Sequence, residues 1–238
     1  MGGVPLNIPR KNYRGSKDRL CSVDFQKYMK ILLENLGKKF RKEWIFRRVN
    51  LTFELGNNYT FVGPNGSGKS TLLQVLAGAM PHTEGNIAYL NASGEPHNEA
   101  VNIDYIFKKI VIAAPYLELV EEFTLQESVE FHQKFKPLKD NISATQLIDL
   151  LQLSAHKDKT VKNFSSGMKQ RLKLGLAFYS ESPIILLDEP TSNLDAQGTA
   201  WYLEQIEKHT ANRLLIICSN QPNEYTFCEN IIDIRDFK

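Results

Sequence analysis

The fold of this chain is decided by the stretch Gly63-Pro64-Asn65-Gly66-Ser67-Gly68-Lys69-Ser70. It matches the pattern G-x-x-x-x-G-K-[ST] at every position. Glycines at these places allow backbone N–H groups to turn inward and line a concave site for anions. A helix that begins directly after the loop adds a favourable dipole for phosphate. The sequence therefore predicts a loop that holds the phosphates of a nucleotide.

The residues on either side have the pattern that such a loop needs. Residues 59–62 read as a short strand, and a helix is expected from about Lys69 to Met80. We expect Lys69 to reach the β- and γ-phosphates and Ser70 to place its hydroxyl on Mg²⁺. The alternative is a glycine turn without a ligand. We assign nucleotide binding to Gly63, Pro64, Asn65, Gly66, Ser67, Gly68, Lys69, Ser70 and Thr71.

A second motif supplies the carboxylates. Residues 184–187 form an apolar run that ends in Asp188 and Glu189. Charges at the end of a buried strand need a partner, and Mg²⁺ is a natural one. We expect Asp188 to be the carboxylate on the magnesium side, and Glu189 to orient or deprotonate the attacking water. An acidic strand end at the surface is the alternative, but a phosphate loop elsewhere in the chain favours catalysis.

The remaining sequence alternates strands and helices. Val49 to Leu55 alternates apolar and polar residues, and a turn of Gly and Asn leads to residues 59–62, which predicts a hairpin. Another strand is expected at 110–114. Helices are expected at 124–135, where Thr124 and Glu127 form a capping box, and at 143–153 and 168–179. This order predicts an α/β fold, a P-loop NTPase with a mainly parallel core sheet.

Two further motifs resemble the ABC ATPase superfamily. Residues 164–171 (Phe-Ser-Ser-Gly-Met-Lys-Gln-Arg) are similar to its signature motif, and residues 192–195 (Ser-Asn-Leu-Asp) to its D-loop. The resemblance covers residues 29–238. It implies one ABC ATPase domain with an antiparallel β subdomain and a small helical insert at about 115–165.

The resemblance also implies a partner subunit. Ser165, Ser166 and Gly167 stand at an expected helix start and offer a second anion site, although an ordinary helix cap would have the same residues. In the family, two subunits pair head to tail, and each signature closes over the ATP held by the other. This implies a second ATPase subunit, in a homodimer or heterodimer. Phe40 lies where the family places an aromatic residue against adenine, and a core position is its alternative.

The sequence departs from the family pattern at two places. A glutamine is expected after strand 110–114, yet none occurs before Gln126. A histidine is expected after the strand that begins at Leu214, and Asn220 occupies the equivalent position. An amide can donate a hydrogen bond to phosphate but cannot carry a positive charge. We therefore place Asn220 with Lys69 and Glu189 among the catalytic residues and expect hydrolysis to be slow.

Composition limits the other possibilities. The chain has 238 residues and a net charge of +2, but residues 1–28 alone carry six basic and two acidic residues. We expect these residues to be a disordered basic tail, either an upstream extension before a natural start at Met29 or a functional arm. The folded part is then slightly acidic, which speaks against specific nucleic-acid binding. Cys21, Cys218 and Cys228 have no metal-like spacing, and Cys218 is expected to be a buried apolar residue.

These observations favour a motor for membrane transport. The sequence has no apolar run long enough to span a membrane, so a separate transmembrane permease subunit is expected, with this chain at the cytoplasmic face of the membrane. One alternative is an ABC protein that acts outside transport, on nucleic acid or ribosomes. Another is an assembly subunit that is gated by ATP and hydrolyses it slowly, which the two departures favour.

Overall fold

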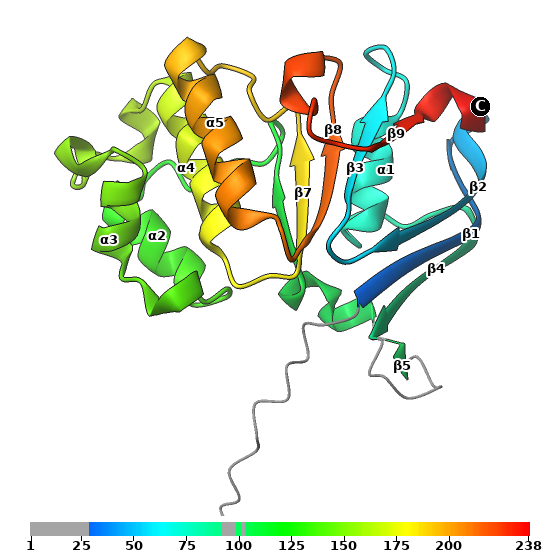
Figure 1. Ribbon diagram of the computed structural model, residues 1–238, viewed down its shortest axis with the longest axis horizontal. Coiled ribbons are helices and arrows are strands. Elements are labelled where there is room, and N and C mark those ends of the chain that lie inside the picture. The colour runs from blue at the N-terminus through cyan, green and yellow to red at the C-terminus, as the bar shows by residue number, and fades with distance from the viewer. Residues whose placement is uncertain (1–28, 92–98, 101–102) are drawn as a thin grey trace, which may run out of the picture.

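Two sheets and five α-helices organise the part of the chain that the computed structural model describes, residues 29–91, 99–100 and 103–238 (Figure 1). The expected tail, with Cys21, lies outside these residues. The strands are β1 (Met29–Phe40), β2 (Glu43–Glu54), β3 (Asn58–Val62), β4 (Glu84–Asn91), β5 (Glu99–Ala100), β6 (Ile110–Ala113), β7 (Ile184–Asp188), β8 (Leu214–Cys218) and β9 (Asn230–Asp233). The helices are α1 (Lys69–Leu76), α2 (Leu125–Gln133), α3 (Ala144–Leu150), α4 (Ser166–Tyr179) and α5 (Ala196–His209).

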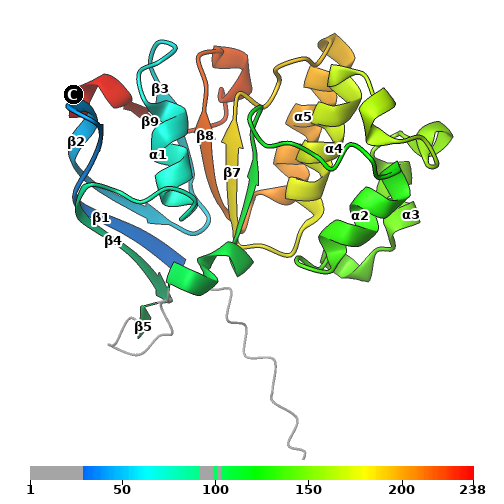
Figure 2. The same cartoon turned by 180° about the vertical axis from the view of Figure 1, so that it is seen from behind.

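The core sheet is parallel, with strand order β6-β7-β8-β3-β9. Every residue of β7 and β8 is buried, which is typical of parallel strands covered on both faces. Along β7, Ile184 and Leu186 belong to a core shared with α1 and the antiparallel sheet. Ile185 and Leu187 belong to a second core shared with α2, α3, α4 and α5. Figure 2 shows α1 on one side of the core sheet and α4 and α5 on the other side, with α2 and α3 farther from the sheet than α4 and α5.

The predicted hairpin at residues 49–62 is wrong. Both strands exist, but β2 pairs with β1 in the antiparallel sheet, whereas β3 pairs in parallel with β8 and β9. The turn between them carries the chain from one sheet to the other, and the Gly56 N–H donates to the carbonyl oxygen of Arg213 at 3.2 Å. Because Tyr59, Thr60 and Phe61 are all buried, β3 suits the interior of a parallel sheet better than a hairpin.

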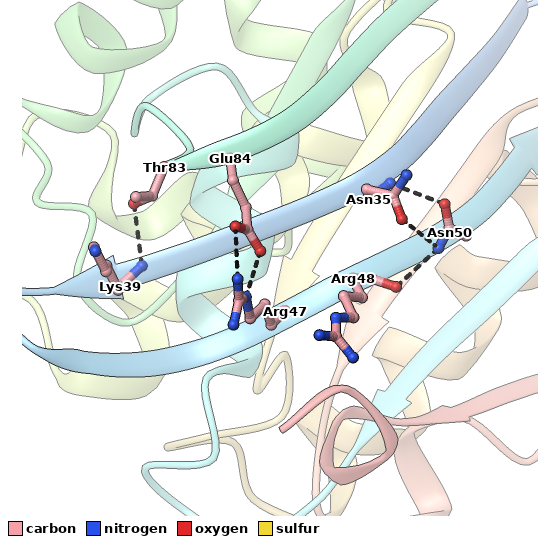
Figure 3. Close-up of polar contacts among 7 residues, drawn as sticks. All are labelled: Asn35, Lys39, Arg47, Arg48, Asn50, Thr83 and Glu84. Atoms are coloured by element: carbon pink, nitrogen blue, oxygen red, sulfur yellow. Dashed lines mark hydrogen bonds and ion pairs between the residues drawn. The ribbon is translucent and has the colours of Figure 1, made fainter.

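The antiparallel sheet has the order β2-β1-β4-β5. A side-chain ion pair joins β2 to β4 across β1, which lies between them (Figure 3). Arg47 of β2 donates from Nε to Oε1 of Glu84 in β4 at 2.7 Å, and from Nη2 to Oε2 at 3.3 Å. Gly37 of β1 lies directly opposite Glu84, and a Cβ there would stand 2.7 Å from Glu84 Cγ. Glycine at this position therefore gives the Glu84 side chain room beside β1.

A second pair of side chains braces the same strands. Asn35 interrupts β1 with a φ of 49°, at a shift in the β1–β2 register. Its N–H donates to Oδ1 of Asn50 at 2.8 Å, and Nδ2 of Asn50 donates to the Arg48 carbonyl at 2.9 Å (Figure 3). These bonds satisfy backbone groups that the irregular register leaves without a ladder partner.

The expected helices are present: α1, α2 and α3 are shorter than expected, whereas α4 begins two residues earlier, at Ser166. The capping box of α2 is confirmed, since Thr124 Oγ1 accepts from the Glu127 N–H and Glu127 Oε2 accepts from the Thr124 N–H. Cys218 is fully buried, as expected. Helix α5 and strands β1, β4, β5 and β9 had no residue range in the sequence prediction. In the part of the chain that the structure covers, no helix combines the length and the apolar character that crossing a membrane requires.

Candidate functional site

The phosphate loop follows β3 and leads into α1, as its sequence predicts. Gly63, Gly66 and Gly68 have φ values of 140°, 76° and 108°, in the region that favours glycine. At Gly68 there is also no room for a side chain, because a Cβ would stand 2.5 Å from Cγ2 of Ile45. Any other residue at position 68 would therefore strain the loop and displace Ile45.

Lys69 is folded back over this loop. Its side chain is buried, and Nζ donates to the carbonyl oxygens of Gly63 at 2.7 Å and Pro64 at 3.2 Å. No carboxylate within the described ranges lies within 4.0 Å of the Lys69 ammonium. Ser67 is also buried, and its Oγ has no hydrogen-bond partner among these residues. A cation and a donor hydroxyl that are both available suit a bound phosphate.

The loop forms a pocket together with the catalytic carboxylate expected from sequence. The volume of the pocket is about 190 Å³, and its lining residues are Ile45, Asn65, Gly66, Ser67, Gly68, Lys69, Ser70, Thr71 and Glu189. Sequence reasoning did not find Ile45, which comes from β2 in the other sheet. The antiparallel sheet thus contributes a wall of the pocket.

Asp188 ends β7 beside the first turn of α1. Its side chain is buried, and its Oδ1 has no hydrogen-bond partner among the described residues. Burial raises the pKa of the Asp188 carboxyl to about 6, while a hydrogen bond with Ser70 acts in the opposite direction. A buried carboxylate oxygen without a partner, next to a serine hydroxyl, is a suitable pair of oxygen ligands for Mg²⁺.

Glu189 has an unusual backbone. Its φ is 43°, in the left-handed region that residues other than glycine seldom adopt. The conformation is held by the Glu189 N–H, which donates to the Cys218 carbonyl at 2.9 Å, and by the Glu189 carbonyl, which accepts from Ser192 N at 3.0 Å. Such strain concentrates at functional sites, where the surrounding structure holds it in place.

The two positions that depart from the family pattern lie near the pocket. The Asn220 side chain donates from Nδ2 to Oδ1 of Asn65, which places the amide against the phosphate loop. After β6, Pro115 and Tyr116 stand where a glutamine was expected. Burial raises the pKa of Tyr116, the nearby Asp188 carboxylate raises it further, and a hydrogen bond with Gln74 of α1 lowers it. Sequence reasoning did not anticipate a tyrosine in place of the expected glutamine.

The signature residues form a separate pocket of about 390 Å³. Signature residues in its lining are Ser165, Ser166, Gly167, Met168 and Arg171, and D-loop residues are Asn193, Leu194 and Asp195. Leu153 and Gly198 complete the lining. Ser165 caps α4 by accepting from the Met168 N–H at 3.2 Å, so the ordinary cap is present. Within one chain, the residues that line this pocket are entirely different from those that line the loop pocket.

Phe40 lies at the end of β1 with 46% of its surface exposed. The alternative of a core position is therefore wrong, and Phe46 is the fully buried phenylalanine of this region. Nζ of Lys38 lies 4.9 Å from the centre of the Phe40 ring. An exposed ring is free to stack on a base, and the contact with adenine remains a prediction.

Comparison with known proteins identifies relatives along most of the chain. A family model described as ABC transporter matches residues 46–192. The ABC transporter ATP-binding protein YybJ of Bacillus subtilis is 29% identical over 203 residues, which cover 84% of this chain and 90% of YybJ. The lantibiotic transport ATP-binding protein SrtF of Streptococcus pyogenes is 28% identical over 79% of this chain and 78% of its own length. The dimeric structure of the bacterial ABC transporter cassette MJ0796 superposes with a TM-score of 0.71 at 24% identity, over 85% of this chain and 93% of the cassette.

Proposed function

The chain belongs to the ABC transporter family as an ATP-binding and ATP-hydrolysing subunit, and we propose that two such subunits assemble head to tail. The observation that supports this arrangement is the pair of pockets on one chain, each built around backbone and side-chain donors suited to an anion. In a twofold assembly, the loop pocket of each subunit would face the signature pocket of the other, which gives two composite sites. The relative MJ0796 is described as dimeric, which is consistent with the proposal.

Within each composite site, the residues have separate roles. Lys69 and the loop N–H groups would bind the β- and γ-phosphates, and the exposed Phe40 ring would stack on adenine. Ser70 and Asp188 would hold Mg²⁺, whose charge offsets that of the phosphate oxygens when it is bound. The signature residues Ser165, Ser166 and Gly167 would close over the γ-phosphate from the other subunit.

Hydrolysis requires a positioned water. Glu189 lines the loop pocket and would orient that water or accept its proton. Asn220, held against Asn65 of the loop, would donate a hydrogen bond to the γ-phosphate from the other side. Since phosphoryl transfer depends on positioning and charge stabilisation, these two side chains would set the rate.

The proposed partner is a separate transmembrane permease, with this chain at the cytoplasmic face of the membrane. The relatives YybJ and SrtF are named as ATP-binding proteins of transporters, which supports this part of the proposal. Recovery of a membrane protein with the tagged full chain, dependent on coexpression with its neighbouring genes, is the expected result. A ribosome or DNA pellet that retains the chain instead would contradict the transport role.

The head-to-tail arrangement is tested by trapping the dimer. We expect Glu189→Gln to be monomeric without nucleotide and dimeric with ATP and Mg²⁺ by light scattering. Adding Lys69→Ala should abolish the dimer by preventing ATP binding. Adding Ser166→Glu should also abolish it but leave ATP binding intact, because the new carboxylate would repel the γ-phosphate of the other subunit. A Ser166→Glu, Glu189→Gln protein that dimerises as readily as Glu189→Gln would overturn the arrangement.

A further inference from the structure

Glu224 is a fully buried carboxylate that sequence reasoning did not single out. It lies in the short 3-10 turn Pro222–Glu224 after β8. Its Oε1 accepts from the N–H of Thr191 at 2.8 Å and from the Thr191 hydroxyl, and its Oε2 accepts from the hydroxyl of Ser219. No lysine, arginine or histidine nitrogen in the described part of the chain lies within 4.0 Å of this carboxylate.

The three donors come from the two segments that carry the expected catalytic side chains. Thr191 is the second residue after Glu189, and Ser219 directly precedes Asn220. The carboxylate of Glu224 therefore ties the end of β7 to the end of β8 at one point. Only neutral N–H and O–H groups donate hydrogen bonds to this buried carboxylate. Loss of any one donor would leave the buried charge with fewer partners, which would destabilise the fold.

Both ends of this connection are fixed to rigid elements. The Ser219 N–H donates to the Phe61 carbonyl at the end of β3 at 3.1 Å. The Tyr202 hydroxyl of α5 donates to the Glu224 carbonyl at 3.0 Å. Gln170 of α4 donates from Nε2 to the Pro190 carbonyl at 2.7 Å, between Glu189 and Thr191. Movement of the Glu224 carboxylate would therefore shift both segments relative to the loop pocket.

We propose that Glu224 is a positioning residue that sets Glu189 and Asn220 at the distance hydrolysis requires. This inference rests on the proposed function, since it concerns the same site. The group must be an acceptor at both oxygens, because the Thr191 N–H, the Thr191 hydroxyl and the Ser219 hydroxyl all donate to it. Glutamine has nearly the same shape but replaces one acceptor by a donor, so Glu224→Gln disturbs the geometry with little change in volume.

The experiment compares Glu224→Gln with Thr191→Val, which removes one donor hydroxyl, and with Glu229→Gln as a matched control on an exposed glutamate of the same region. For each protein, the full chain is assayed for kcat, for ATP affinity by equilibrium titration, and for unfolding. We expect Glu224→Gln to lower kcat by about ten- to a hundredfold, with the ATP Kd within about twofold, since misplacement costs rate more than binding. Thr191→Val should lower kcat in the same way, and the double variant should be no worse than Glu224→Gln alone.

The outcomes separate this inference from the function on which it rests. If the parent chain and Glu229→Gln hydrolyse ATP and Glu224→Gln does so equally fast, the positioning role is wrong and the function stands. A loss of kcat that matches a loss of folded protein also overturns it. So does a double variant whose loss of kcat equals the product of the losses in Thr191→Val and Glu224→Gln. A parent chain that binds ATP without hydrolysing it, alone or with its permease, would contradict the function itself.

Discussion

The side-chain amide of Asn220 donates a hydrogen bond to the side-chain oxygen of Asn65, which joins the segment after β8 to the phosphate loop. The two residues are 155 positions apart in the chain. This contact places a neutral amide where the sequence pattern led us to expect a histidine, which can carry charge. The chemical difference between the two side chains leads to the first prediction.

Asn220→His is expected to raise the rate of ATP hydrolysis. A hydrogen bond to a charged group is worth about 1.5–3 kcal/mol, compared with about 1 kcal/mol for a neutral pair. A gain near 1.4 kcal/mol in the transition state corresponds to about a tenfold faster step. The gain should appear as pH falls through about 6.5, where an imidazole takes up its proton. A pH series of steady-state turnover for both proteins measures it.

The parent chain should show little pH dependence near 6.5, since Asn220 has no proton to gain. Asn220→Ala serves as the control and should be slower than the parent, because it removes the donor. A fast parent enzyme with no gain from Asn220→His would mean that a different residue has this role.

Lys69→Ala is expected to abolish useful ATP binding. The Lys69 ammonium is buried between loop carbonyls and faces no carboxylate in the described residues, so it is available to the phosphates. Its loss removes a charge-assisted hydrogen bond from the phosphate loop, where the Lys69 side chain is buried. Equilibrium titration with a fluorescent ATP analogue should show no saturation at concentrations that saturate the parent. Lys208→Ala, which removes an exposed lysine paired with Glu204 on α5, should bind as the parent does.

Glu189→Gln is expected to keep ATP binding and lose turnover. The substitution removes the base but keeps a side chain of the same size at the edge of the loop pocket. Single-turnover measurements should therefore show bound ATP that is not converted to ADP. Intact hydrolysis in this variant would assign the base to a different residue.

Gly68→Ala is expected to destabilise the protein and weaken ATP binding. The new Cβ would stand 2.5 Å from Cγ2 of Ile45, at a φ of 108° that alanine seldom adopts. Strain of this kind costs about 1–3 kcal/mol. Urea unfolding of Gly68→Ala, Ile45→Ala and the double variant separates the two causes. The double variant should recover the part due to the collision and keep the part due to φ, so full additivity of the single effects would contradict this account.

Stability is expected to fall as the pH is lowered below about 6.5. Burial, with the nearby Lys136 ammonium, lowers the pKa of His132 to about 4, and the ring shares a hydrogen bond of 2.7 Å with Ser180. At a pH between the pKa of His132 in the folded chain and that in the unfolded chain, the histidine binds a proton only in the unfolded chain. Lowering the pH through this range therefore favours unfolding. Lowering the pH from 7.5 to 5.5 should cost on the order of 1 kcal/mol for this group, since His132 keeps some contact with solvent.

Urea unfolding at the two pH values tests this, with His132→Gln as the variant. His132→Gln should lose part of the pH dependence and leave a remainder. His209 would account for that remainder, because burial also lowers its pKa to about 4. An unchanged pH dependence of stability in His132→Gln would show that a group other than His132 takes up the proton on unfolding.

Local motifs predicted the central parts of the site because each is contained in a few consecutive residues. The loop at 63–70 and the strand that ends in Asp188 depend on glycine and charge at fixed spacing, and both lie where they were expected. The hairpin was wrong because an alternating pattern followed by a turn does not show which sheet receives the second strand. Only the burial of β3 on both faces decides that, and burial is a property of the whole fold.

Other features could not be read from sequence because their parts are far apart. The Glu224 carboxylate accepts a hydrogen bond from Thr191, 33 residues away in the chain, so no short sequence pattern indicates this contact. Ile45 reaches the loop pocket from a different sheet. Phe40 and Phe46 are both aromatic residues near a strand end, and only the packing of β1 and β2 shows that the first is exposed and the second buried.

The alternation of side chains along β7 decides which face of the sheet the Asp188 side chain occupies. Asp188 has the same parity as Ile184 and Leu186, which belong to the core shared with α1, and Ser70 lies in the first turn of α1. Removing a single residue within the strand would shift every later side chain to the opposite face. Asp188 would then point toward α4 and α5, away from Ser70. The proposed role of Asp188 on the magnesium side therefore depends on the even spacing of four residues between Ile184 and Asp188.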